Sequence, residues 1–215
     1  MAQKPIVVID PGHGGPDTGA IGSHGILEKE VVLKIAKECL VLNHTLFRDS
    51  LEIYLTRYRD TLISLGDRAL LPKVLEADVF VSIHCNQAPN VKAQGFEIFL
   101  INGKVNRKSY VVAHTLAHYL QSRLGIHDRG IKQANFQVLR DTFGHCSSIL
   151  LETGFLSNDL EADHVLKKEG QSAIALALLQ SLIKTFYHDW DIQDLGCLIA
   201  TTVFRSYAGF TEGNR

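Results

Sequence analysis

Two histidines and a glutamate, each at or just after the end of an apolar segment, are the residues of this 215-residue chain best suited to metal chemistry. His13 stands in the glycine-rich stretch IDPGHGG, shortly after the apolar residues 6–9. His84 ends the run DVFVSIH, and Glu152 ends SSILLE. Two histidines and one carboxylate leave a fourth zinc position open for water, which is the usual composition of a catalytic zinc site. A further carboxylate could then move the proton.

Alternating strands and helices must position these residues. Apolar runs predict strands at 6–9, 51–57, 78–84, 95–101, 136–140 and 147–152. Helical spacing predicts helices at 28–47, 107–124, 158–168 and 171–188. One more helix is predicted to begin after Ser64, which would be its N-cap. Strands that alternate with helices predict a single α/β domain, with a sheet covered by helices on both faces.

Such a sheet would bring the candidate residues together. Ligands of open α/β sheets bind beyond the carboxyl ends of the strands. His13, His84 and Glu152 lie at or after such ends, and Glu28 begins the helix 28–47, whose N-terminus faces the same edge. We therefore expect all four side chains at one rim. The glycines around His13 allow a tight turn and leave room for a substrate.

Each residue taken alone has another explanation. His13 could be a turn residue that bonds its own backbone, and His84 could be a buried, hydrogen-bonded histidine. Glu28 could be a carboxylate favoured by the helix dipole, and Glu152 could be an ion-pair partner. The expected convergence favours a site over these alternatives but leaves them open.

Other histidines give weaker signals. His114 and His118 have the spacing of a metal-binding pair on a helix, but no glutamate completes an HExxH pattern. Their helix is expected to pack on the sheet, so we predict no metal there. His24 lies between His13 and Glu28 and could approach a substrate.

The four cysteines show no CxxC spacing and are expected to be buried or free thiols; they are Cys39, Cys85, Cys146 and Cys197. Alternation along a strand points Cys85 away from the face of His84, which predicts a buried thiol. A ligand set that includes Cys85 or Cys146 is the alternative.

Composition excludes some partners. The formal net charge is −1, so there is no overall polycation to hold nucleic acid. No apolar run reaches the roughly 20 residues of a membrane-spanning helix. The first residues, MAQKPIVV, lack the pattern of a signal peptide.

Six blocks, in order, resemble a known family. They are VVIDPGHGGPDTGAIG, GILEKEVVLKIA, LTRYRDTLISLGDRALL, FVSIHCNQAPN, RGIKQANFQVLRDT and ILLETGFLSN. Together they resemble the zinc-dependent N-acetylmuramoyl-L-alanine amidases, the type 3 amidase domain of cell-wall hydrolases, over about residues 5–187. One departure is that His145-Cys146-Ser147-Ser148 stands where the family often has a proline.

The resemblance implies a twisted, mostly parallel or mixed six-stranded sheet and a catalytic domain over residues 5–188. It also implies one Zn²⁺ per chain bound by His13, Glu28 and His84, with Glu152 as the catalytic glutamate. The substrate would be peptidoglycan, cut at the amide between N-acetylmuramic acid and L-alanine, so the protein would act outside the cytoplasm. Residues 189–215 would be a C-terminal extension of unknown role.

Neighbouring polar residues could orient the metal ligands. Asp10 and Asn86 are candidates for holding His13 and His84, while turn formation and strand capping are equally open for them. Two other functions also remain open. One is a different zinc hydrolase, such as a peptidase that cuts stem peptides. The other is a non-catalytic wall-binding module, which would be expected to lack the glutamate present at position 152.

The chain also predicts that no activator protein is obligatory. The link at 102–108 has seven residues, and one helical turn takes about 3.6 residues. It is therefore too short to place a helix over the zinc and return. Only the segment after Asp189 could cover the cleft, so we predict an open fourth zinc position.

Overall fold

Six strands form one sheet in the order β2-β1-β3-β6-β4-β5. The structure is a computed structural model that describes residues 3–103 and 106–187. The strands are β1 Ile6–Pro11, β2 Glu52–Leu55, β3 Val79–Asn86, β4 Phe96–Ile101, β5 Asp128–Ala134 and β6 Ser147–Phe155. All neighbours are parallel except β4 and β6, which are antiparallel. The predicted fold class, a single α/β domain with a mixed six-stranded sheet, is confirmed.

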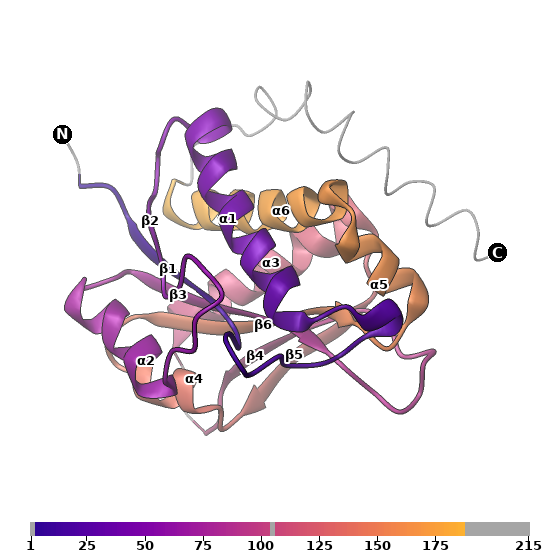
Figure 1. Ribbon diagram of the computed structural model, residues 1–215. Coiled ribbons are helices and arrows are strands. Elements are labelled where there is room, and N and C mark those ends of the chain that lie inside the picture. Colours follow the sequence, from indigo (N-terminus) through magenta and orange to yellow (C-terminus); the bar gives the residue numbers. More distant parts are fainter. Residues whose placement is uncertain (1–2, 104–105, 188–215) are drawn as a thin grey trace.

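Helices cover both faces of the sheet (Figure 1). One face is packed by α1 Glu28–Phe47, α3 Arg107–Leu124 and α6 Lys168–Phe186, with α5 Asp159–Leu166 leading into α6. The other face is packed by α2 Leu65–Val74 and α4 Gln137–Thr142. Successive strand residues serve opposite cores, as in β1, where Val7 and Ile9 join the first and Val8 joins the second. The second layer is short, and the part of the sheet that it leaves open carries the candidate site.

One predicted strand is wrong. Residues 136–140 begin the helix α4, and the fifth strand is β5, at Asp128–Ala134. The run FQVLR is too short for periodicity to separate strand from helix. It folds as a helix that buries Val138 and Leu139 against the sheet. β5 is an edge strand that pairs with β4 alone, so it needs few apolar residues and its polar sequence gave little signal.

Two smaller expectations, the helix cap at Ser64 and the buried thiols, agree with the structure. Ser64 caps α2, because its Oγ accepts a hydrogen bond from the backbone N–H of Asp67 at 3.1 Å. Cys39, Cys85 and Cys146 are free and buried. Cys197 and the predicted extension 189–215 lie outside the described residues.

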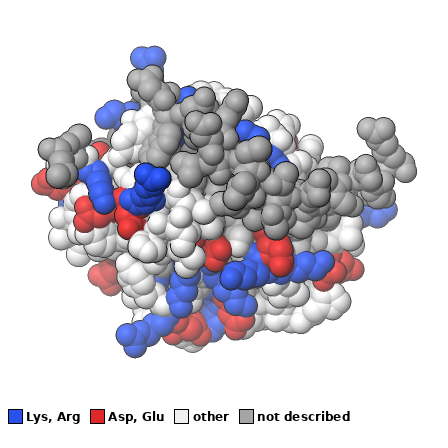
Figure 2. All heavy atoms as spheres, turned by 90° about the horizontal axis from the view of Figure 1, so that it is seen from above, with Lys and Arg blue, Asp and Glu red and all other residues white. Residues whose placement is uncertain are grey.

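Two surface features bear on possible partners. Within residues 3–103 and 106–187, none of the helices combines the length and the apolar character that crossing a bilayer requires. Figure 2 shows basic and acidic side chains interspersed over the face seen from above Figure 1.

Candidate active site

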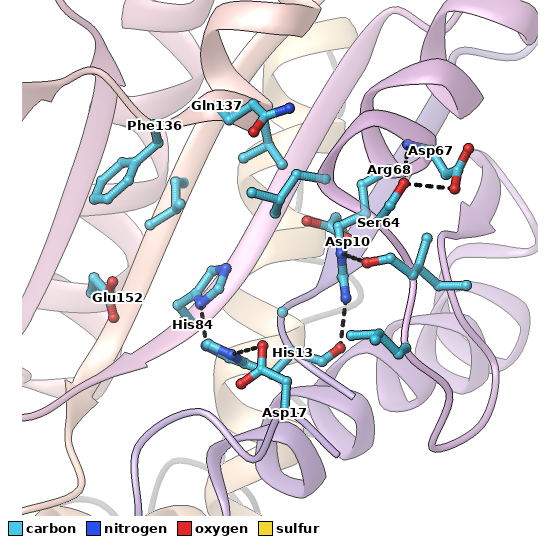
Figure 3. A pocket seen from close by; sticks show the side chains of 16 residues that line it. Asp10, His13, Asp17, Ser64, Asp67, Arg68, His84, Phe136, Gln137 and Glu152 are labelled. Atoms are coloured by element: carbon cyan, nitrogen blue, oxygen red, sulfur yellow. Dashed lines mark hydrogen bonds and ion pairs between the residues drawn. The ribbon is translucent and has the colours of Figure 1, made fainter. Parts of the chain in front are cut away.

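Three elements bring His13, Glu28 and His84 to one point. His13 lies in the loop after β1, Glu28 is the first residue of α1, and His84 lies near the end of β3. The side chains of His13 and His84 line a cleft, where Figure 3 shows the two imidazoles pointing toward one another, and Glu28 contacts both of them. The predicted convergence of these three residues is thus present in the fold.

The three facing atoms form a small triangle. His84 Nδ1 is 2.9 Å from Glu28 Oε1 and 3.2 Å from His13 Nε2, and the third side, from His13 Nε2 to Glu28 Oε1, is 3.1 Å. Zinc–nitrogen bonds of about 2.0–2.1 Å in a tetrahedron would separate ligand atoms by about 3.4 Å. The triangle therefore has nearly the size of one face of a zinc tetrahedron, and these residues form a possible metal-binding group.

Charge within the triangle favours binding of a cation. Burial lowers the pKa of His13, but the hydrogen bonds and charges of Glu28 and Asp17 outweigh it and raise that pKa to about 8. Burial raises the pKa of Glu28, but its contacts with His13 and His84 hold it far below the usual range. In the absence of metal, a proton on His13 balances the Glu28 carboxylate. A divalent cation would take the place of that proton.

Hydrogen bonds from outside the triangle fix its members. Glu28 Oε1 accepts a hydrogen bond from the backbone N–H of Cys85 at 2.9 Å, and Oε2 accepts one from Ala20 at 2.8 Å. His13 Nδ1 lies 2.8 Å from Asp17 Oδ2. A carboxylate on this nitrogen selects the tautomer that leaves Nε2 free to bind metal. Sequence reasoning missed Asp17, although a carboxylate four residues after a candidate ligand was an available signal.

Two glycines are required because side chains of the site lie against them. A Cβ on Gly12 would lie 2.2 Å from Cε1 of His84. A Cβ on Gly19, whose φ is +65°, would lie 2.5 Å from Glu28 Oε2. The glycine-rich stretch around His13 therefore lets the backbone pack directly against the metal-facing groups.

Two buried arginines hold the loop that carries His13. Arg68 donates to the backbone oxygens of Pro11 and His13, at 2.8 and 2.6 Å. Arg57 donates to the oxygens of Pro11 and Gly12, at 2.9 and 2.7 Å. His13 has a φ of +59°, which is uncommon for a residue other than glycine, and these bonds hold that conformation. Neither arginine was singled out from the sequence, although both lie in the block LTRYRDTLISLGDRALL.

Asp10 acts on His13 only through Arg68. Its Oδ1 accepts from Arg68 Nη1 at 2.7 Å and from Thr56 at 2.6 Å, and its Oδ2 accepts from Ser82 at 2.7 Å. Asp10 therefore anchors the arginine that holds the His13 carbonyl.

Glu152 faces the triangle from the next strand. It is the parallel partner of His84 in the β3–β6 register. Its Oε2 is buried and has no hydrogen-bond partner among the described residues. Burial, more than any other cause, raises the pKa of Glu152 to about 7, and the negative charge of Glu28 adds to the effect. A carboxyl group with this pKa can both accept and donate a proton near neutral pH.

A cleft of about 800 Å³ connects these groups. His13, His84 and Glu152 line it together with apolar residues from the two small helices and the loop before α2; among these are Leu62, Ile63, Leu65, Phe136 and Val138. Apolar walls with a few convergent polar groups are typical of ligand sites.

Two other candidate residues lie elsewhere. Asn86 donates to Glu97 Oε2 at 3.3 Å and accepts from the backbone of Gln87 at 2.8 Å, so its side chain holds β4 and the β3–β4 loop. His24 is exposed, lies 3.8 Å from Asp163 and does not line the cleft.

The side chains of the alternative metal ligands His114, His118 and Cys85 are not part of the triangle. His114 packs on the ring of Tyr110. His118 packs on Tyr119. Cys85 is buried, with its Sγ 3.2 Å from Thr153 Oγ1, and burial raises the pKa of its thiol well above the ordinary value.

Comparisons with known proteins give consistent matches. Residues 7–184 match the family described as N-acetylmuramoyl-L-alanine amidase. The chain is 34% identical over 178 residues to the probable cell wall amidase LytH of Staphylococcus saprophyticus, covering 82% of this chain and 56% of the relative. It is 37% identical over 156 residues to the N-acetylmuramoyl-L-alanine amidase LytC of Bacillus subtilis, covering 73% and 30%. The chain thus spans less than two thirds of these two relatives.

A solved structure agrees over nearly its whole length. The N-acetylmuramoyl-L-alanine amidase AmiC2 of Nostoc punctiforme superposes with a TM-score of 0.78 at 31% identity, and the match covers 86% of this chain and 99% of that one.

Proposed function

Because this chain belongs to the N-acetylmuramoyl-L-alanine amidase family, we propose that it hydrolyses the amide bond between N-acetylmuramic acid and the L-alanine of the stem peptide in peptidoglycan. The observation that carries the proposal is the position of a buried carboxylate, Glu152, beside a triangle of two imidazoles and one carboxylate in an open cleft.

The donor set of the triangle fits one zinc ion per chain. Two imidazole nitrogens and one carboxylate oxygen, from His13, His84 and Glu28, are ligands that zinc takes in hydrolases. Their separations of 2.9–3.2 Å suit its short bonds. When bound, zinc acidifies water and polarises a carbonyl group.

Glu152 would transfer the proton. Burial raises the pKa of Glu152, whereas a bound dication would lower it, so Glu152 would be ionised at neutral pH and would accept a proton from the attacking water. The water oxygen bonds to the lactyl carbonyl carbon, and the bond from that carbon to the alanine nitrogen breaks. Glu152 donates its proton to that nitrogen as this bond breaks, so the nitrogen leaves as a neutral amine. Oε2 suits this role because no described residue competes for it.

The apolar walls of the cleft would keep the proton transfer away from bulk water. Burial is the main cause of the raised pKa of Glu152, so a substrate that fills the cleft would strengthen the same effect. Arg57, Arg68 and Asp10 would act only by holding the His13 loop.

We further propose that the domain, residues 5–188, works outside the cytoplasm and without an activator protein. His13, His84 and Glu152 all line the cleft, which supports a site that a substrate can reach. The peptidoglycan substrate fits the family to which the chain belongs.

Product analysis tests this function. Purified protein with zinc should release new amino-terminal alanine from purified peptidoglycan and create no new termini within the stem peptide. Cuts within the peptide would instead show a peptidase. No cut by protein that holds zinc would contradict the proposal, and Glu152→Gln serves as the matched control for background hydrolysis.

A further inference from the structure

An acidic side chain with two cations lies next to Glu152 on the sheet. Glu97 of β4 is the direct antiparallel partner of Glu152, so the two carboxylates share one face. Glu97 Oε1 accepts hydrogen bonds from Arg129 Nε at 2.7 Å and from Lys132 Nζ at 2.6 Å. We call these three residues the Glu97 cluster. The three side chains together carry one net positive charge, and the carboxyl group of Glu161 also lies within electrostatic range of Arg129.

The cations of the cluster are fixed but accessible. The side chain of Glu97 is 7% exposed, whereas those of Arg129 and Lys132 are 34% and 40% exposed. Arg129 stacks over the ring of Phe155, with its guanidinium carbon 4.9 Å from the ring centre. Arg129 Nε is taken by Glu97, and Nη1 donates to the backbone oxygen of Gln94 at 3.4 Å, so Nη2 is the nitrogen that would donate to an added anion.

A continuous aromatic surface joins the cluster to the cleft. Lys132 Nζ lies 6.0 Å from the ring centre of Phe99. The ring of Phe99 is 5.3 Å from that of Phe136, which lines the cleft. A ligand that leaves the cleft past Phe136 therefore meets Lys132 next.

The order of the strands sets the direction in which a substrate must lie. His13 follows β1, His84 lies near the end of β3, Glu152 lies on β6, and the cluster lies on β4 and β5. In the proposed reaction Glu152 donates a proton to the alanine nitrogen, so that nitrogen lies on the Glu152 side of the carbonyl carbon. The peptide attached to it then continues toward β4 and β5. The muramoyl group occupies the opposite end of the cleft.

The distance from Glu152 to the strand that carries Arg129 and Lys132 matches the length of one peptide residue plus a side chain. Two strand spacings separate β6 from β5, about 10 Å. The alanine nitrogen must lie about 3 Å from Glu152 for proton transfer. The alanine itself spans up to about 3.6 Å, so the second residue of the peptide begins about two thirds of the way from β6 to β5. A carboxylate on that residue falls within the length of an arginine or lysine side chain.

We propose that Arg129 and Lys132 bind the free carboxylate of the stem-peptide residue that follows the alanine. In peptidoglycan this residue is a glutamate linked through its γ-carboxyl, so its α-carboxyl is free or amidated. Charged donors give strong hydrogen bonds to such a group. Glu97 holds both cations in place. The inference rests on the proposed function, because that function fixes where the peptide lies.

Two ligands that differ only in this carboxylate test the inference. N-acetylmuramoyl-L-alanyl-γ-D-glutamyl-L-lysine carries it, and the same compound with D-isoglutamine in place of D-glutamate has an amide there; in both, the γ-carboxyl is in a peptide bond, as in the wall. Their binding to zinc-loaded Glu152→Gln protein is measured by calorimetry, since that variant should hold them without turnover. We expect the carboxylate compound to bind about ten-fold more tightly, as one charge-assisted hydrogen bond at a partly exposed position provides.

Variants in the same background assign the preference to the cluster. Replacing Glu97, Arg129 and Lys132 together by glutamine removes every charge of the cluster without leaving a carboxylate unpaired, and it should make the two affinities equal. Lys132→Gln alone leaves the bond between Arg129 and Glu97 and should reduce the preference even if the triple variant does not fold. Lys37→Gln, an exposed change on α1, is the control and should retain the full preference.

The outcomes separate the inference from the function on which it rests. Equal affinities in the parent protein, or a preference that survives both cluster variants, would overturn the inference. If wild-type protein still releases amino-terminal alanine from the wall, the proposed function stands and only the carboxylate site fails. If the wall is not cut, both fail.

Discussion

Replacement of Asp17 should weaken metal binding without removing a metal ligand. Asp17 Oδ2 lies 2.8 Å from Nδ1 of His13, on the side of the imidazole away from the triangle. Asp17→Ala removes both the charge and the acceptor, whereas Asp17→Asn keeps an acceptor oxygen. We therefore expect a graded loss of zinc affinity, larger for alanine.

The structure sets the size of this loss. A hydrogen bond to a charged group contributes about 1.5–3 kcal/mol, but the Asp17 side chain is 52% exposed, which weakens the bond. Loss of such outer partners typically costs about 10–100-fold in metal affinity. We expect about 10-fold for asparagine and closer to 100-fold for alanine. Turnover at saturating zinc should change much less, because Glu152 and the cleft are untouched.

A matched pair on the far side of α1 provides the control. Asp49 Oδ2 lies 2.9 Å from His44 Nδ1 and the Asp49 side chain is 49% exposed, so the carboxylate contacts match, although the His44 side chain is 75% exposed and that of His13 is 23% exposed. Zinc affinity is measured by competition with a chelator for Asp17→Asn, Asp17→Ala and Asp49→Asn, and imidazole nitrogen shifts report the tautomer of His13. Wild-type affinity in Asp17→Ala, alongside loss of zinc in His13→Ala, would refute the assigned role.

Three further outcomes follow from the same site and its surroundings. Glu152→Gln should retain zinc yet lose roughly 10²–10⁴-fold in hydrolysis rate, whereas Glu28→Gln should lose zinc. Metal analysis and a rate assay on the same samples distinguish the two variants, and a near-normal rate in Glu152→Gln would contradict the mechanism. Zinc affinity should fall as pH drops below about 8, because His13 then holds a proton that zinc must displace; chelator competition between pH 6 and 9 measures the slope, and a flat profile would show that no proton is displaced. Burial lowers the pKa of His164 to about 4. As pH falls from 6.5 toward 4, the unfolded chain binds a proton at this histidine before the folded chain does, so the free energy of unfolding falls by up to roughly 3 kcal/mol. The free energies of unfolding of wild type and His164→Gln, measured with urea, should converge over that range, and parallel curves would argue against this assignment.

The convergence of the site could be predicted because it follows from strand direction. His13, His84 and Glu152 lie at or after the carboxyl ends of parallel strands, and Glu28 begins a helix that returns to the same edge. Strand direction in an α/β sheet follows from the alternation of helices and strands, which apolar spacing reveals. The rim could therefore be derived before any contact was known.

The hydrogen bonds that hold the His13 loop in place could not be predicted, because most of them join a side chain to a backbone atom. Arg68 is fixed by the carbonyl oxygens of Pro11 and His13. Any residue offers such an oxygen, so the sequence carries no partner signal for the arginine. Asp17 is different, since its spacing from His13 was visible and only the loop conformation was unknown. β5 was missed because an edge strand needs few apolar residues.

The antiparallel placement of β4 has a consequence for how the site can change over evolution. Because β4 and β5 run against β6, the rim joins the ends of β1, β3 and β6 to the beginnings of β4 and β5. The segments that precede β4 and β5, residues 87–95 and 125–127, therefore open onto the same rim without supplying any member of the triangle. Insertions and substitutions there can remodel the surface beyond Glu152 while leaving His13, Glu28 and His84 in place. The reversed strand thus separates the part of the rim that is free to diversify from the part that chemistry holds constant.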